Sequence, residues 1–107
     1  MTGVAAEHYR LLVIEDEVDI RRAVSAALRD QHPAIIEAST GTAGIDAVDS
    51  SHPDLIILDL GLPDTLGHDL LRTIRARNEG VPVIVLSSRG DEASKVQALD
   101  LGALTTT

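Results

Sequence analysis

The sequence predicts a small α/β fold in which a doubly wound parallel sheet is covered by helices on both faces. Short apolar runs alternate with stretches of helical periodicity four times along the chain. The length of 107 residues allows one domain. Two of the apolar runs also end in carboxylates, at Glu15-Asp16 and at Asp59, which indicates a functional edge of the sheet.

The first strand and the first helix are expected at residues 10–14 and 19–30. Residues 10–14 are short, apolar and rich in branched side chains, as in a buried strand. Residues 19–30 have the helical period, and Pro33 disfavours helix in the residue before it. The helix is expected to have a sheet-facing stripe and a water-facing side. The stripe consists of Ile20, Ala23, Val24, Ala27 and Leu28. The water-facing side carries Arg21, Arg22 and Arg29.

The middle of the chain predicts two further strands with a short helix between them. Residues 34–38 form the second strand, and residues 42–50 form a helix that Pro53 ends. Residues 40–44 lack the glycine spacing and the lysine of a phosphate-binding loop, so we interpret them as a turn leading into this helix. Residues 54–58 form the most apolar strand and lead directly into Asp59.

Helices are next expected at residues 67–78 and 91–101, with a strand at residues 81–86 between them. The helix at 67–78 has an apolar face, and the strand is a run of branched apolar residues. Asp91 and Glu92 fall in the first turn of the last helix, where the helix dipole favours negative charge.

Composition limits the functions open to this chain. A net charge of −8 argues against binding to nucleic acid or to an anionic membrane surface. There are no cysteines, which excludes disulfides and thiolate metal sites. The apolar runs are far shorter than a membrane span, and residues 1–9 read as a tail without the features of a signal peptide. We therefore expect a cytoplasmic domain.

The carboxylates at the strand ends predict a metal site. Glu15 and Asp16 follow the first strand, Asp59 follows the third and Ser87 follows the fourth. Ligands bind outside the carboxyl ends of the strands in an open parallel sheet, so neighbouring strands would bring these residues together. A single aspartate after a strand is more often a turn residue or a helix cap, so the prediction depends on the set. Carboxylates within about 6 Å raise one another's pKa unless a cation is present, and oxygen ligands favour Mg²⁺ or Mn²⁺.

Four motifs in order resemble the receiver domain of bacterial two-component response regulators. They are Val13-Ile14-Glu15-Asp16-Glu17, the run from Asp54 to Asp64, Pro82-Val83-Ile84-Val85-Leu86-Ser87, and Ala98-Leu99-Asp100-Leu101-Gly102-Ala103. The resemblance covers residues 10–103 and is strongest to transcriptional regulators with a winged-helix effector, in particular potassium-uptake (KdpE-like) regulators. It implies a flavodoxin-like (CheY-like) fold with the strand order 2-1-3-4.

The resemblance also implies roles for particular residues. Asp59 would accept the phosphoryl group from a sensor histidine kinase, and Ser87 would contact that group and act as a switch. Glu15, Asp16, Asp59 and the main-chain carbonyl of Gly61 would hold Mg²⁺. The domain would be a signalling module and not an enzyme, with DNA binding left to another domain. For the arginines of the helix at 67–78, a solvated surface and a kinase-docking role are the two interpretations; these are Arg72, Arg75 and Arg77.

The end of the chain departs from the family pattern. The family continues with an Asp-Asp-Tyr-Leu-x-Lys-Pro type segment, whereas this chain reads Ala-Leu-Thr-Thr-Thr at 103–107. We therefore interpret residues 104–107 as an aberrant tail and expect the fifth strand and fifth helix to be missing. The only lysine is Lys95, which falls within the helix expected at residues 91–101. The lysine of the family segment therefore has no counterpart here, and phosphorylation is expected to be impaired. An exposed fourth strand would favour a homodimer or a domain-swapped oligomer.

Two other functions are open at this stage. The domain can be a remnant that is not phosphorylated and that acts by dimerisation or sequestration. It can also be an aspartate-nucleophile phosphatase of the haloacid dehalogenase type. That mechanism needs a second acid two residues after the nucleophile, a position that Gly61 holds here.

Overall fold

Five strands and three helices make up the part of the chain that the structure, a computed structural model, describes. The described residues are 9–29, 34–59, 62, 64, 67–86 and 104–106. The strands are β1 (Arg10–Ile14), β2 (Ala34–Ala38), β3 (Leu55–Asp59), β4 (Val83–Leu86) and β5 (Leu104–Thr106). The helices are α2 (Val18–Leu28), α3 (Gly41–Ser51) and α4 (Gly67–Arg77). Within these residues, no helix combines the length and the apolar character that a membrane crossing requires.

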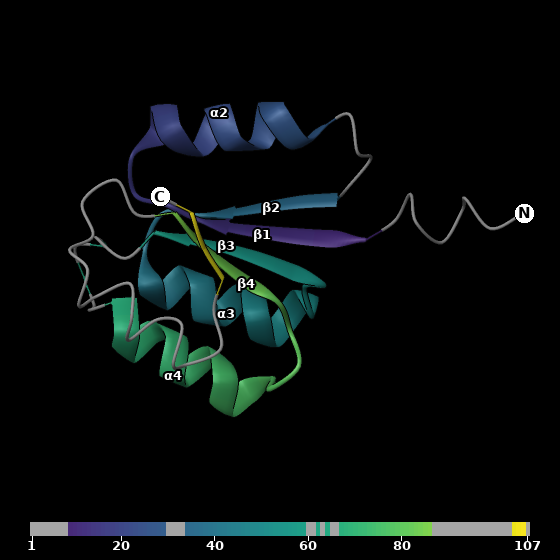
Figure 1. The fold of residues 1–107 in the computed structure, drawn as a ribbon, viewed down its shortest axis with the longest axis vertical. Helices are drawn as coiled ribbons and strands as arrows, with labels where there is room; N and C mark the ends of the chain where they lie inside the picture. Colours follow the sequence, from purple (N-terminus) through teal and green to yellow (C-terminus); the bar gives the residue numbers. More distant parts are fainter. Residues whose placement is uncertain are drawn as a thin grey trace, which may run out of the picture.

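The strands form one parallel sheet in the order β2-β1-β3-β4-β5 (Figure 1). β1 pairs with β2 on one side and with β3 on the other, and β4 pairs with β3. β1 and β3 lie inside the sheet and are buried because helices cover both of its faces. Their nearly continuous apolar sequences match this position. The predicted α/β fold and the order 2-1-3-4 are confirmed. The helix predicted at 91–101 lies outside the described residues.

β5 corrects the expectation that a fifth strand is missing. Leu104–Thr106 pair in parallel with β4, from Ile84 opposite Leu104 to Leu86 opposite Thr106. Main-chain N–H and C=O groups make such a ladder, so it needs no particular side-chain pattern, and threonine suits extended backbone. β4 is therefore not an edge strand of the described sheet, and an exposed edge there no longer argues for dimerisation.

Two apolar clusters fill the spaces between the sheet and its helices. α2 covers one face, and α3 and α4 cover the other (Figure 1). The larger cluster lies on the side of α3 and α4, where Val48, Leu70, Leu71 and Ile74 meet Leu12, Ile14, Ile56, Leu58, Val83 and Val85. The smaller cluster lies on the side of α2 and is built on Leu11, Val13 and Ile57. Successive side chains of a strand point to opposite faces of the sheet and therefore pack in different clusters.

The face that α2 turns toward the sheet differs from the predicted stripe. Of that stripe, only Val24 and Leu28 pack against the smaller cluster. The exposed members are Ile20, Ala23 and Ala27. Ser25 is instead 1% exposed, and the Arg21 side chain, predicted to face water, is 17% exposed. The prediction was wrong here because Glu37 on β2 offers both residues a charged partner, which the apolar pattern does not reveal.

Polar side chains complete the N-terminus of α3. Thr40 Oγ1 accepts a hydrogen bond from the N–H of Ala43 at 3.1 Å, so the predicted turn into a helix is confirmed. The Asp64 carboxylate accepts hydrogen bonds from the N–H groups of Gly41 and Thr42, at 2.8 and 3.1 Å. These bonds lower the pKa of Asp64. They also tie Asp64 to α3, whose first N–H groups have no partner within the helix.

α3 lies against β1 at a glycine. A Cβ added to the buried Gly44 would lie 2.6 Å from Cδ1 of Ile14, a distance that packed carbon atoms do not reach. Ile14 is itself fully buried, so its side chain has little room to move away. The missing side chain at Gly44 therefore sets how closely α3 approaches the sheet.

The substitution Gly44→Ala is expected to destabilise the domain by about 1–2 kcal/mol through overpacking. The loss should appear even though alanine favours a helix over glycine by roughly 1 kcal/mol. Ile14→Val removes Cδ1, so the double variant should recover part of the loss. Denaturant unfolding of the wild type, both single variants and the double variant measures this coupling. Additive effects of the two substitutions would contradict the contact.

Candidate metal centre

The pairing of β1 with β3 brings three carboxylates to one end of the sheet. Ile14 lies opposite Leu58, and the next residues along these strands are Glu15 and Asp59. Asp16 follows Glu15 directly. One oxygen atom from each of the three carboxylates lies within 4.8 Å of the others. The structure thus brings the adjacent acids Glu15 and Asp16 together with Asp59, which lies 43 residues after Asp16 in the sequence. Their roles stay predictions.

Glu15 is the most buried member of this cluster, with 5% of its surface exposed. Burial raises the pKa of Glu15 from 4.5 to about 7, and hydrogen bonds to Asp16 and Asp59 together with the charge of Asp59 act in the same direction. The N–H of Glu17, which donates to Glu15 Oε2 at 3.1 Å, lowers the pKa and partly opposes the effect of burial. The cluster therefore disfavours full ionisation unless positive charge is supplied.

Asp16 shows what kind of group would complete the cluster. Its Oδ1 atom is buried and has no hydrogen-bond partner among the described residues. Such an acceptor is costly to bury unless a ligand takes it up. The donor set consists of carboxylate oxygens without nitrogen or sulfur, which suits a hard divalent cation such as Mg²⁺. The residues present therefore fit the ion that the sequence predicts.

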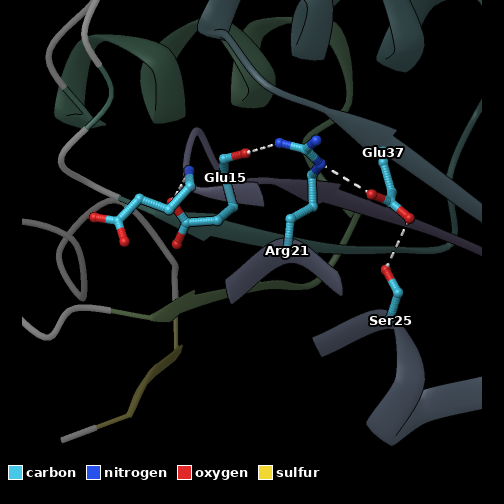
Figure 2. Close-up of polar contacts among 5 residues, drawn as sticks. Glu15, Arg21, Ser25 and Glu37 are labelled. Atoms are coloured by element: carbon cyan, nitrogen blue, oxygen red, sulfur yellow. Dashed lines mark hydrogen bonds and ion pairs between the residues drawn. The ribbon is translucent and has the colours of Figure 1, made fainter. Parts of the chain in front are cut away.

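A polar network beside the carboxylates links α2 to β2, and Figure 2 shows its members. Arg21 Nη1 donates to the main-chain oxygen of Glu15 at 2.9 Å, and its Nε donates to Glu37 Oε1 at 2.9 Å. Ser25 Oγ donates to Glu37 Oε2 at 3.3 Å. Sequence reasoning missed this network. The available signal was Glu37 itself, a charged residue inside an apolar strand, together with the helical spacing of Arg21 and Ser25.

Two predicted site residues cannot be placed. Gly61 and Ser87 lie outside the described residues. β4 ends at Leu86, which pairs with Asp59, so the described part of β4 ends beside the carboxylates.

The arginines of α4 have local partners. Arg72 pairs with Asp69 at 3.0 Å, and Arg77 pairs with Asp49 on α3. Arg75 is half-buried and donates to the main-chain oxygen of Val81, so it is not simply a solvated side chain. The contacts of Arg75 and Arg77 hold α4 to neighbouring segments, whereas Arg72 pairs within α4 and is more than half exposed, and none of the three contacts adds support for a docking surface.

Comparison with known proteins connects this geometry to a family. The family model for the response regulator receiver domain matches residues 11–106. A receiver domain protein (CheY-like) from Methanospirillum hungatei JF-1 has a TM-score of 0.84 and covers 92% of this chain and 81% of that chain. Its sequence identity is 21%, so this similarity speaks for the fold alone.

Two relatives are similar over most of this chain. The KDP operon transcriptional regulatory protein KdpE of Escherichia coli (strain K12) is 46% identical over 93 residues. The transcriptional regulatory protein KdpE of Mycobacterium tuberculosis is 48% identical over 93 residues. In each case the match covers 87% of this chain and 41% of the relative. As the motif resemblance predicts, this chain belongs to the response regulator receiver domain family.

Proposed function

We propose that this domain takes up a phosphoryl group on Asp59 from a sensor histidine kinase, with Mg²⁺ held by Asp16, Glu15 and Asp59. The observation that carries the proposal is the cluster of three carboxylates within 4.8 Å, one of them with a buried and unpartnered oxygen. Such a cluster is unfavourable by itself and becomes favourable with a divalent cation. It therefore supports a metal-dependent reaction at a carboxylate.

The position of Asp59 suits a nucleophile. It is the last residue of β3, so the strand fixes its main chain while its half-buried side chain faces the acidic cluster. An oxygen of Asp59 would attack phosphorus in line, and the phosphorus–nitrogen bond to the kinase histidine would break, with its electron pair left on the imidazole. Mg²⁺, when bound, would neutralise charge on the phosphoryl oxygens. Glu15 and Asp16 would hold the cation beside Asp59.

The partner and the output belong to the proposal as well. The matched relatives are named as transcriptional regulators, and this chain spans about 41% of their length. We infer that the domain is the cytoplasmic input part of such a regulator and that any contact with DNA is made elsewhere. The net charge of −8 supports the second inference, because nucleic-acid binding needs a basic surface.

Asp59→Asn is expected to abolish phosphorylation, because the amide is not a nucleophile of comparable strength. Incubation with acetyl phosphate and Mg²⁺, followed by intact-mass measurement, should show one added phosphoryl group on the wild type and none on this variant. Asp46→Asn, at an exposed position of α3, is the control and should label like the wild type. Equal labelling of the Asp59 variant and the wild type would refute the proposal.

Glu15→Gln is expected to stabilise the metal-free domain near pH 8 by roughly 1–3 kcal/mol. The pKa of Glu15 is raised from 4.5 to about 7, so the folded state binds more protons than the unfolded state between these values. Wild-type stability should therefore fall as pH rises through this window, and the glutamine variant should lack this fall. Denaturant unfolding from pH 4 to pH 8 with a chelator measures the difference.

The metal provides the complementary test for Glu15. Saturating Mg²⁺ should remove the advantage of the glutamine variant or reverse it, because a bound cation favours the ionised carboxylate. Glu79→Gln, at an exposed position after α4, is the matched control and should follow the wild type. A wild-type stability that does not change across this pH window would argue against a carboxyl group held protonated by burial.

A further inference from the structure

Arg21 makes a contact that its place on the helix surface does not require. Its Nη1 donates to the main-chain oxygen of Glu15 at 2.9 Å, and its side chain is only 17% exposed. An arginine on a surface helix ordinarily keeps its guanidinium in water. Here the group is instead directed at the turn between β1 and α2, the turn that carries Glu15 and Asp16 (Figure 2).

The atom that Arg21 contacts determines what the contact can do. The main-chain oxygen of Glu15 belongs to the peptide unit that joins Glu15 to Asp16. Because a peptide unit is planar, a hydrogen bond at its oxygen fixes the orientation of the whole unit. The N–H of Glu15 donates in turn to the main-chain oxygen of Ala38 on β2 at 3.0 Å. The backbone at Glu15 and Asp16 is thus fixed by one hydrogen bond to β2 and by another from Arg21 on α2.

Glu37 holds the guanidinium in this orientation. It accepts a hydrogen bond from Arg21 Nε at 2.9 Å and a second one from Ser25 Oγ at 3.3 Å. Glu37 lies opposite Val13 in the ladder between β1 and β2, so its position is set by the sheet. The planar guanidinium presents donors in a rigid fork, which lets one side chain bind Glu37 and the Glu15 oxygen at once.

We propose that Arg21 is a positioning residue for the metal centre: it orients the Glu15–Asp16 peptide unit so that both carboxylates face Asp59. The proposal rests on the proposed function of this site as a Mg²⁺ centre. It predicts that replacing Arg21 changes the affinity for Mg²⁺ in the direction opposite to the one expected from its charge. A positive charge near a cation site weakens cation binding by Coulomb repulsion, so removal of the charge alone would strengthen Mg²⁺ binding. Loss of positioning would weaken it.

The decisive variant is Arg21→Met, which keeps much of the side-chain length and removes the charge and the donors. Titration calorimetry with MgCl₂ should show binding about 10-fold weaker than in the wild type. Arg21→Lys keeps the charge and loses the fork, and it should give an intermediate loss. Arg22→Met, at the exposed neighbouring position on α2, removes the same charge without touching the network and should bind Mg²⁺ like the wild type. Tighter binding by Arg21→Met would overturn the proposal.

Two further measurements separate positioning from other effects. In acetyl phosphate labelling, Arg21→Met should raise the Mg²⁺ concentration needed for the half-maximal rate about 10-fold, with the rate at saturating Mg²⁺ changed less than about 3-fold. In the metal-free protein, the backbone amide resonances of Glu15, Asp16 and Glu17 should shift or broaden in Arg21→Met and stay in place in Arg22→Met. Unchanged resonances would overturn the proposal without reference to the metal.

These readouts also separate the failure of the two proposals. If the wild type does not bind Mg²⁺, the proposed function fails, and the amide resonances alone decide the role of Arg21. If Arg21→Met does not fold, Arg21→Lys and Glu37→Gln carry the test. Both should weaken Mg²⁺ binding several-fold, and binding equal to the wild type in both would overturn the proposal.

Discussion

The carboxylates of Glu15, Asp16 and Asp59 lie within a few ångströms of one another at the end of the paired strands β1 and β3. They repel one another when ionised, and the packing of the domain keeps them together. The pairing of β1 with β3 sets their spacing, and the fully buried side chains of Leu12, Ile14 and Leu58 anchor those strands in the core. A free loop would let the charges separate into water. A strand end inside a packed sheet does not, so the domain keeps a pre-formed place for positive charge.

The features that sequence predicts well here are those that local pattern determines. The strands at 10–14 and 34–38 have the predicted bounds, because both runs are shorter than a usual helix and contain branched side chains that favour extended backbone. The convergence of Asp16 and Asp59 could be predicted for a related reason, since parallel strands end at the same edge of a sheet. The strand order itself came from the motif resemblance and not from periodicity.

The features that sequence analysis missed depend on contacts between distant segments. Arg21 reads as a solvated helix residue until Glu37 is known to lie beside it. Asp64 reads as a turn residue, and nothing in its neighbourhood indicates that it binds the first turn of α3. The strand at Leu104–Thr106 was missed for a different reason: a ladder needs main-chain groups, whereas the prediction depended on the side chains that relatives carry there.

The contact between Gly44 and Ile14 has a consequence for how any signal leaves the acidic site. Ile14 is the residue before Glu15, and it fits under α3 with no spare space. A helix locked onto a strand in this way cannot slide or roll over it, so β1 and α3 should move as one rigid unit. If Asp59 reacts as proposed, a conformational change that starts there would be expected to leave along β4, with the β1–α3 unit acting as the fixed frame.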